Sequence, residues 1–379
     1  MSHPNIPSAQ PSSHQHEQFA EAYRVLEEAI AAHAFPGCAF GLLAGGAVML
    51  QDGLGRFTYE EDAPAVAGDT IYDIASVSKV AATTAAAMLL YQRGLLDLEM
   101  PLGDLLPGFV VGRARGDRAR HVKLRHLFAH SSGLPGYVEF FRTASTPAAL
   151  FRACLQLPVE TEPGERYEYS DPGFILLGKA LEVLAHERLA PWVHRDITLP
   201  LGMTATAFCP SLSMHSSIPP TEEDTSFRHR RIQGEVQDEN AWVLKGVAGH
   251  AGLFSNVPDL LCFAQEILHA QQEGAADTEN RFLFHAATVE FFAQRQGPEG
   301  SSRALGWDTP STPSSSGSLF SPHSIGHLGF SGCSLWIDLD ARVAVVLLTN
   351  RTWPSRHEAG RQLIRSVRPA FHDALRKVL

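Results

Sequence analysis

Lysine and cysteine are both scarce in this sequence. Only five of the 379 residues are lysines, and the five cysteines are scattered, odd in number and without a Cys-x-x-Cys pair. Such cysteines are most simply interpreted as free buried thiols in a reducing compartment. We therefore expect neither a disulfide framework nor a metal site.

Positive charge and long apolar runs are also in short supply. The formal net charge is −10 at pH 7, whereas a nucleic-acid partner requires a basic face. No apolar run reaches the length of a membrane span, and residues 1–16 lack the apolar core of a signal peptide. We expect a soluble cytoplasmic protein that acts on a small molecule, with no nucleic-acid or membrane partner and a disordered tail over residues 1–16. The sequence leaves the oligomeric state open.

The chain does contain enough apolar sequence for a sizeable core. Apolar residues make up 44% of it and charged residues 19%, which excludes global disorder. Its length exceeds the roughly 100–200 residues of a typical domain. One large domain with an inserted lobe, or two domains that share a cleft, would account for this length.

The two ends of the chain mirror each other in their patterns. Helical spacing over residues 17–33 precedes a hairpin-like pair of apolar runs within 37–51. Two further apolar runs within 334–349 precede a helical stretch from about Glu358. One antiparallel sheet built from both ends and flanked by the terminal helices would satisfy this pattern.

The predicted fold class is therefore α/β (α+β) with an inserted all-α lobe. Residues 17–79 and 246–379 are expected to form the sheet domain. Residues 80–245, which have mostly helical and loop patterns, are expected to form a mainly helical inserted domain.

The strongest local signal is the segment Ser76-Val77-Ser78-Lys79, which opens an apolar, small-residue helix. Residues i and i+3 share a helix face, so the Ser76 hydroxyl and the Lys79 amine can meet. Burial and the positive helix N-terminus disfavour a charged amine, so we expect a neutral lysine that accepts the serine proton. The alternative is a serine cap with a solvent-exposed lysine, because short motifs often arise by chance.

A Ser-x-x-Lys pair leads us to expect two further elements downstream, and both occur in order. Tyr169 follows a Pro-Gly turn and could relay a proton between Ser76, Lys79 and the leaving group. It could equally be a packing residue, and Asp171 before a proline could be a helix N-cap.

The third element is the segment GHLGFSG, residues 326–332, directly before a predicted strand. Its glycines would let the backbone approach a substrate closely. The backbone N–H groups of Phe330 and Ser76 could then form an oxyanion hole. The alternative is a glycine-rich strand entry in which His327 occurs by chance.

Taken in this order, the three elements resemble those of class C β-lactamases, DD-peptidases and related esterases. The segments LRHLFAHSSGLP (residues 124–135) and LPLGM (residues 199–203) resemble further motifs of that superfamily. The resemblance runs from about Phe35 to Arg351. It implies a β-lactamase/transpeptidase-like fold, with an antiparallel sheet domain, an all-α domain and the active site between them.

The resemblance also implies roles for individual residues. Ser76 is expected to be the nucleophile, Lys79 the base and Tyr169 the proton shuttle. The N–H of Phe330 is expected to donate to the oxyanion, and His327 stands at a catalytic position. We expect no cofactor.

Two departures from the family pattern bear on the substrate. Asp171 stands where many relatives have Asn, and a carboxylate cannot donate a hydrogen bond unless it is protonated. The third motif is His-Leu-Gly, whereas β-lactamases have Lys-Thr-Gly. Leu328 removes a hydroxyl that could bind a substrate carboxylate, and His327 is expected to be only partly cationic. These changes predict slow turnover of β-lactams.

The segments QGEVQDENA (residues 233–241) and GVAGHAGLFS (residues 246–255) resemble a subgroup linked to cell-wall peptides. Their acidic residues could bind a substrate amine or a metal, or Asp238 could cap a turn. His250 could approach the cleft or satisfy a loop. Together with Asp171 and Gly329, His250 and Glu239 are our candidate substrate-binding residues.

Three functions fit the sequence. The first is a serine hydrolase that cuts an amide or ester through an acyl-enzyme. Its substrate would be a muropeptide, whose carboxylate Arg228, Arg230 and Arg231 could bind. The second is a β-lactamase or promiscuous carboxylesterase. The third is a penicillin-binding sensor that acylates without turnover.

Overall fold

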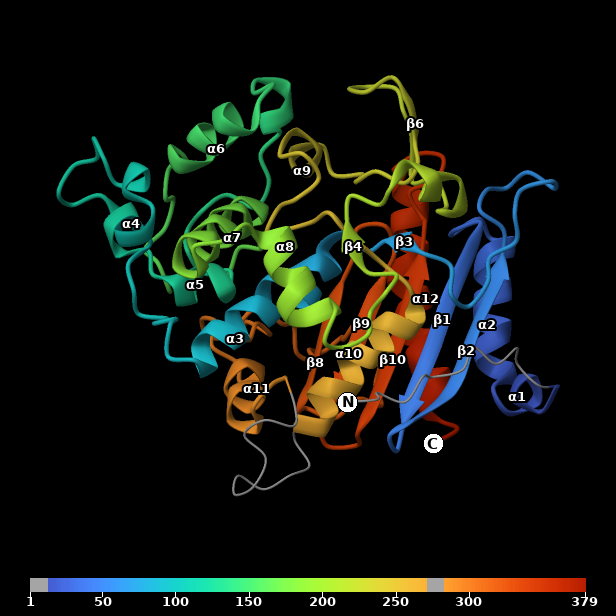
Figure 1. Cartoon of the computed structure of the whole chain (residues 1–379). Helices are drawn as coiled ribbons and strands as arrows, with labels where there is room; N and C mark the ends of the chain where they lie inside the picture. The colour runs from blue at the N-terminus through green and yellow to red at the C-terminus, as the bar shows by residue number, and fades with distance from the viewer. Residues whose placement is uncertain (1–12, 271–282) are drawn as a thin grey trace.

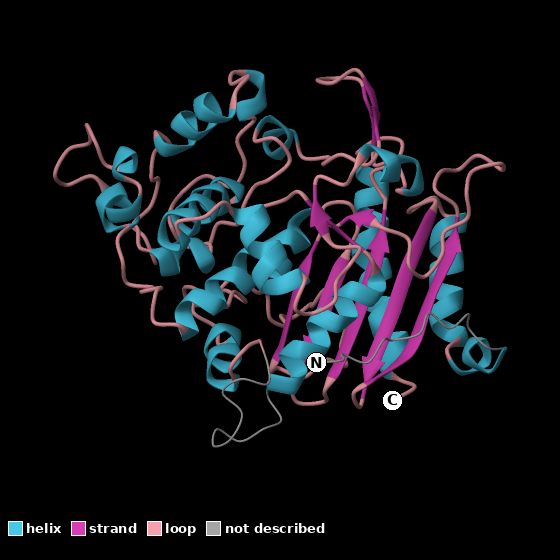
Figure 2. Cartoon of the chain, viewed as in Figure 1, coloured by secondary structure: helices cyan, strands magenta, loops and turns pink. Residues whose placement is uncertain are grey.

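Strand β10 (Val343–Thr349) forms the centre of the main sheet, and its residues are buried. In the computed structural model, which describes residues 13–270 and 283–379, five antiparallel strands lie in the order β2-β1-β10-β9-β8. The pair β1 (Gly37–Ala44) and β2 (Ala47–Gly55) comes from the start of the chain. The predicted antiparallel sheet built from both ends is therefore confirmed (Figures 1 and 2).

The remaining elements follow in chain order. The helices are α1 (Ser13–Gln18), α2 (Ala20–Ala31), α3 (Ala85–Gln92), α4 (Leu102–Leu105), α5 (Leu124–Phe128), α6 (Pro147–Leu155), α7 (Asp171–Ala185), α8 (Leu189–Val193), α9 (Glu239–Val243), α10 (Val257–Ala270), α11 (Ala286–Ala293) and α12 (Glu358–Arg376). The strands are β3 (Tyr72–Asp73), β4 (Ala207–Phe208), β5 (Glu222–Asp224), β6 (Arg230–Ile232), β7 (Leu253–Ser255), β8 (Ser324–Leu328) and β9 (Ser334–Asp338).

Alternate residues of the central strands face two different cores, because successive side chains of a strand point to opposite faces. Phe40 and Leu347 pack with α2 and α12 on one face. Val346 and Leu348 belong to the larger core on the other face, which α10 covers. Figure 1 shows α10 on one side of the sheet and α2 with α12 on the other. The sheet is thus a layer between two sets of helices.

Helices α3 to α8 lie beside the β8 edge of the sheet (Figure 1). Three short strands, β4, β5 and β6, also occur within residues 80–245, where we expected mainly helices. Strands of two or three residues are too short to produce a detectable period in the sequence. Strand β4 pairs with β7, which we assigned to the sheet domain. The domain boundaries at residues 79 and 246 stay a prediction.

The chain start differs from our expectation of a disordered tail. Residues 1–12 lie outside the described residues, but α1 already begins at Ser13. The His16 ring stacks on Tyr23 with 3.8 Å between centroids, and Gln15 donates to the carbonyl of Met49. These contacts attach α1 to the sheet. Across the two described ranges, none of the helices has both the length and the apolar character that a bilayer crossing demands.

Candidate active site

The backbone turn that carries Ser76 departs from the regular helix that we predicted. Ala75 has a positive φ of 47°, which is strained for a residue with a side chain. A 3₁₀ turn, Ala75–Val77, and a π-helical turn, Lys79–Thr84, then precede α3. The turn still brings the pair together, because Lys79 Nζ donates to Ser76 Oγ at 2.9 Å.

Lys79 is fully buried, and its ammonium group is surrounded by hydrogen-bond acceptors. It donates to Ser76, to Asp171 Oδ1 at 2.7 Å and to the His250 carbonyl at 3.0 Å. Burial lowers the pKa of Lys79, but the Asp171 carboxylate and Tyr169 outweigh it, so the pKa lies above its ordinary value. Our expectation of a neutral lysine is wrong, because an acid 92 positions away neutralises the buried charge.

Asp171 is the first residue of α7, and it is not the helix cap. Ser170 is the N-cap, and its Oγ accepts from the Gly173 N–H at 3.0 Å. The carboxylate of Asp171 is therefore free to pair with Lys79 at the helix N-terminus, where negative charge is favoured. Of the two interpretations left open for Asp171, the N-cap is wrong.

Tyr169 lies against the same pair. Its ring centroid is 4.9 Å from Lys79 Nζ. Burial raises the pKa of Tyr169 above its ordinary value, against the opposing effects of Lys79 and of hydrogen bonds with Lys79 and Ser76. The phenol therefore keeps its proton at neutral pH and is in contact with both predicted catalytic groups.

His130 is a residue to which the sequence analysis assigned no role. Its Nδ1 accepts from the Ser170 N–H at 3.0 Å, and its ring lies 4.4 Å from that of Tyr169. Burial, Arg303 and Lys79 hold the pKa of His130 well below its ordinary value. The neutral imidazole thus positions the loop that carries Tyr169. The family-like motif at residues 124–135 was the available signal.

His327 lies on β8, beside the Ser76 turn. Its Nδ1 donates to the Leu328 carbonyl at 2.8 Å, so the lone pair is on Nε2. Within the described residues Nε2 is buried and has no hydrogen-bond partner. Burial first, then Arg303 and Lys79, hold the pKa of His327 well below its ordinary value. The expectation of a partly cationic histidine is therefore wrong.

Gly329 and Phe330 follow β8 directly. A Cβ on Gly329 would lie 2.6 Å from the Ile74 carbonyl oxygen, so only glycine lets this turn approach the nucleophile turn. The Phe330 carbonyl accepts from Arg351 Nε at 2.8 Å, and its side chain is 46% exposed. The role of the Phe330 N–H as an oxyanion donor stays a prediction.

The acidic segment before α9 has structural partners. Asp238 caps α9 by accepting from the Ala241 N–H at 2.7 Å, and it also contacts His250 Nε2 at 2.9 Å. Glu239 pairs with Arg356 at 2.9 Å. In the part of the chain that the structure describes, no cluster of His, Cys, Asp or Glu could hold a metal ion. Of the alternatives left open for Asp238, the structure therefore supports the helix cap.

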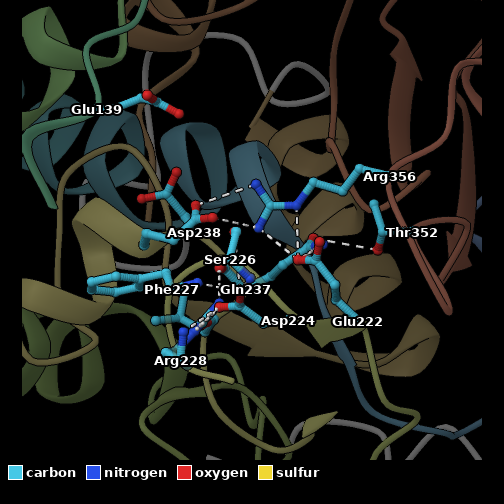
Figure 3. A network of polar contacts seen from close by, with 12 residues as sticks. Glu139, Glu222, Asp224, Ser226, Phe227, Arg228, Gln237, Asp238, Thr352 and Arg356 are labelled. Carbon is cyan, nitrogen blue, oxygen red and sulfur yellow. Dashed lines mark hydrogen bonds and ion pairs between the residues drawn. The ribbon is translucent and has the colours of Figure 1, made fainter. Parts of the chain in front are cut away.

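The three arginines that we assigned to substrate binding are already occupied. The side chain of Arg228 is buried and pairs with Asp224 at 2.9 Å, as Figure 3 shows. Arg230 pairs with Glu235, and Arg231 pairs with Glu223. None of the three lines the cavity at Ser76. This assignment was wrong because the spacing of arginines in a sequence does not reveal their carboxylate partners.

A cavity of about 700 Å³ opens at Ser76. All the predicted site residues except the buried Lys79 line it, and they are Ser76, Tyr169, Asp171, Glu239, His250, His327, Gly329 and Phe330. Six arginines that we did not predict also line it, and they are Arg303, Arg351, Arg356, Arg361, Arg365 and Arg368. Arg303 lies 5.3 Å from the Tyr169 ring and pairs with Asp308 at 3.5 Å.

Asp73, three residues before the nucleophile, joins two walls of this cavity. Its carboxylate accepts from the Ala75 N–H at 2.9 Å and from the Gln237 N–H at 2.7 Å. Burial, with a contribution from Asp238, raises the pKa of Asp73 to about 6, against these two hydrogen bonds. The buried carboxyl thus favours its protonated form more than an exposed one does.

This shift predicts a pH-dependent stability. The pKa of Asp73 is higher in the folded state than the roughly 3.9 of the unfolded state. The protonated carboxyl therefore stabilises the folded state, and this contribution to the free energy of unfolding is fully present below about pH 4. It is lost as the pH rises to about 6, and amounts to at most about 3 kcal/mol. We expect the free energy of unfolding in urea, plotted against pH from 4 to 7, to fall with rising pH more steeply for the wild type than for Asp73→Asn. Parallel curves would contradict the prediction.

A family model described as "Beta-lactamase" matches residues 23–368. The chain belongs to the β-lactamase family. The family, the fold class and the serine hydrolase activity expected from the sequence are thereby confirmed.

Comparisons with individual proteins agree with this family and fold. The chain is 30% identical over 322 residues to an Escherichia coli (strain K12) protein provisionally named D-alanyl-D-alanine carboxypeptidase, covering 78% of this chain and 72% of the relative. Among solved structures, EstCE1, a hydrolase with promiscuous acyltransferase activity, has a TM-score of 0.72 at 23% identity, covering 94% of this chain and 100% of its own. A penicillin-binding protein homologue from Caulobacter crescentus has a TM-score of 0.70 at 17% identity, covering 96% of this chain and 98% of its own. At these identities the structural likeness shows the shared fold.

Proposed function

We propose that this β-lactamase-family hydrolase forms an acyl-enzyme on Ser76 and cuts an amide in a small anionic peptide such as a muramyl peptide. The hydrogen-bonded chain Ser76–Lys79–Asp171 beside the cavity carries the proposal. The E. coli relative's name, a D-alanyl-D-alanine carboxypeptidase, supports a substrate from the cell wall.

Acylation follows from the contacts of the buried lysine. After Lys79 loses a proton, its amine accepts the Ser76 proton as Oγ attacks the substrate carbonyl. The developing oxyanion is stabilised by the N–H groups of Ser76 and Phe330. Tyr169 donates its proton to the leaving amine and recovers one from Lys79.

Deacylation requires a base for the attacking water. His327 is neutral, and the lone pair of its Nε2 has no partner among the described residues. It accepts a proton from the water, whose oxygen attacks the ester carbon, and the Ser76 oxygen leaves with the proton of Tyr169. The protonated His327 then gives up its proton through solvent, which restores the Tyr169 phenol. This step distinguishes a turning-over hydrolase from a sensor that stops after acylation.

Mass spectrometry of products tests this function. The purified chain is incubated with muramyl peptides, unmodified peptides and simple esters, with Ser76→Ala protein as the control. We expect amide cleavage of the muramyl peptides by the wild type alone. If muramyl peptides stay intact while simple esters are hydrolysed rapidly, the chain is a carboxylesterase and the wall substrate is wrong.

β-Lactam turnover should be slow. The site presents a neutral His327, the apolar Leu328 and the carboxylate Asp171, where β-lactamases of the family have Lys, a hydroxyl and Asn. We expect kcat/KM for penicillins at least about 10³-fold below the diffusional ceiling of roughly 10⁸ M⁻¹s⁻¹. The double variant H327K/L328T should raise the value. Wild-type hydrolysis near the ceiling would contradict this prediction.

A further inference from the structure

One face of α12 presents arginines to the cavity. Arg361, Ile364, Arg365 and Arg368 occupy positions i, i+3, i+4 and i+7 of the helix, and all four line the cavity at Ser76. Like charges four positions apart destabilise a helix slightly. The repeated cationic residue on this face is therefore unfavourable for the isolated helix.

Two buried guanidinium groups brace the turn that follows β8. Arg351 Nε donates to the Phe330 carbonyl at 2.8 Å. Arg368 Nη2 donates to the Gly329 carbonyl at 2.7 Å and to the Cys333 carbonyl at 2.9 Å. Within residues 13–270 and 283–379, neither arginine has a carboxylate at ion-pair distance. Burial, assisted by neighbouring arginines, lowers the pKa of each to about 10, so both stay charged at neutral pH.

The two outer arginines are poorly neutralised. Arg361 is 3.6 Å from the exposed Glu358. Arg365 is exposed, and no carboxylate of the described chain pairs with it. Arg356 differs, because it pairs with Glu222 at 2.7 Å, as Figure 3 shows, and with Glu239 at 2.9 Å.

The cavity as a whole has a mixed lining, because seven Asp or Glu residues accompany the six arginines. Around Phe330, however, Arg351, Arg365 and Arg368 have no carboxylate partner among the described residues, so positive charge is in excess there although the chain carries −10. A cavity wall on which one sign of charge is in excess attracts ligand groups of the opposite sign. The guanidinium fork matches the geometry of carboxylate and phosphate groups. The Phe330 ring, 4.5 Å from the Arg351 guanidinium, gives this end an apolar floor.

We propose that Arg351, Arg361 and Arg365 form a subsite next to Phe330 for an anionic group of the substrate, a carboxylate or a phosphate remote from the bond that is cut. The proposal rests on the proposed function of the Ser76 site and specifies its substrate. Arg351 is anchored by its Nε and presents its remaining N–H groups, while Arg361 and Arg365 can adjust from the helix surface.

Matched esters test the subsite. The substrates are the mono-p-nitrophenyl ester of glutaric acid, its methyl-capped neutral counterpart, and an ester of similar length that ends in a phosphate. For the wild type we expect a higher kcat/KM with an anionic ester than with the neutral one. The ratio of kcat/KM for the anionic ester to kcat/KM for the neutral ester should fall about tenfold or more in R361Q/R365Q. The control R230Q/R231Q, whose arginines lie outside the cavity, should keep the wild-type ratio.

The outcomes separate the two proposals. If no ester is hydrolysed in a Ser76-dependent manner, the proposed function fails. The subsite is then judged by calorimetric titration of glutarate and inorganic phosphate into Ser76→Ala protein, with and without R361Q/R365Q. Ester hydrolysis with an unchanged ratio in R361Q/R365Q, or equal anion binding by both proteins, overturns the subsite. The ester with the higher kcat/KM, which ends in either a carboxylate or a phosphate, identifies the anionic group that the subsite binds.

Discussion

Ser76→Ala protein should lose turnover by about 10³-fold or more, because the hydroxyl is the only group at this position that can form the acyl-enzyme. The fold should persist, since Lys79 keeps its bonds to Asp171 and to the His250 carbonyl when the serine oxygen is removed. The measurements are steady-state hydrolysis of a chromogenic ester and thermal unfolding of both proteins.

Covalent trapping supplies the control. Ser78 is also buried, but its Oγ accepts from the Leu253 N–H at 3.1 Å and serves the packing of β7. A phosphonate ester should therefore modify Ser76 and leave Ser78 unmodified, as peptide mass spectrometry can determine. An adduct on any other serine, or full activity in Ser76→Ala protein, would refute the assignment of the nucleophile.

Asp171→Asn should move the pH dependence of acylation. With the carboxylate in place, the pKa of Lys79 lies above its ordinary value, so kcat/KM should rise with pH into the alkaline range. Without it, the lowering effect of burial is no longer outweighed, and the pKa of Lys79 falls. The rising part of the plot of kcat/KM against pH should shift by about 2 pH units or more towards lower pH. The measurement is kcat/KM for a neutral ester between pH 5 and 11.

A second ion pair on the same helix provides the matched control for Asp171. Glu182 of α7 pairs with Lys179 at 2.7 Å, away from Ser76. Its replacement by Gln should leave the rising part of the pH profile unchanged, because neither Glu182 nor Lys179 lines the cavity at Ser76. If Asp171→Asn also leaves the rising part of the pH profile of kcat/KM unchanged, Lys79 is not the group whose deprotonation controls acylation.

The parts of this structure that were predictable rest on local patterns. Long apolar runs identified the strands β1, β2, β9 and β10, and three-residue spacing identified Ser76 and Lys79. The charge states of Lys79 and His327 were mispredicted, because they depend on Asp171, Arg303 and on burial, which only the folded chain brings together.

The arginines show the same limit more directly. Arg228 looked available in the sequence, yet Asp224 and two backbone carbonyls occupy its guanidinium. Arg303 and Arg361 had no local motif to mark them, and only the position of α12 and of the loop before β8 brings them to the cavity. Sequence spacing finds catalytic pairs on one turn of chain but cannot find a charged surface assembled from distant segments.

The pairing of the two chain ends has a consequence for how the protein is made. Phe40 of β1 pairs with Leu347 of β10, about 300 residues later. A ribosome that adds roughly 5–20 residues each second needs about 15–60 s to supply that partner. Throughout this interval the β1 edge that β10 will cover is unpaired on the growing polypeptide, where it could associate with other nascent chains. Slower elongation should therefore lower the soluble yield of this protein more than that of one whose strands pair with near neighbours.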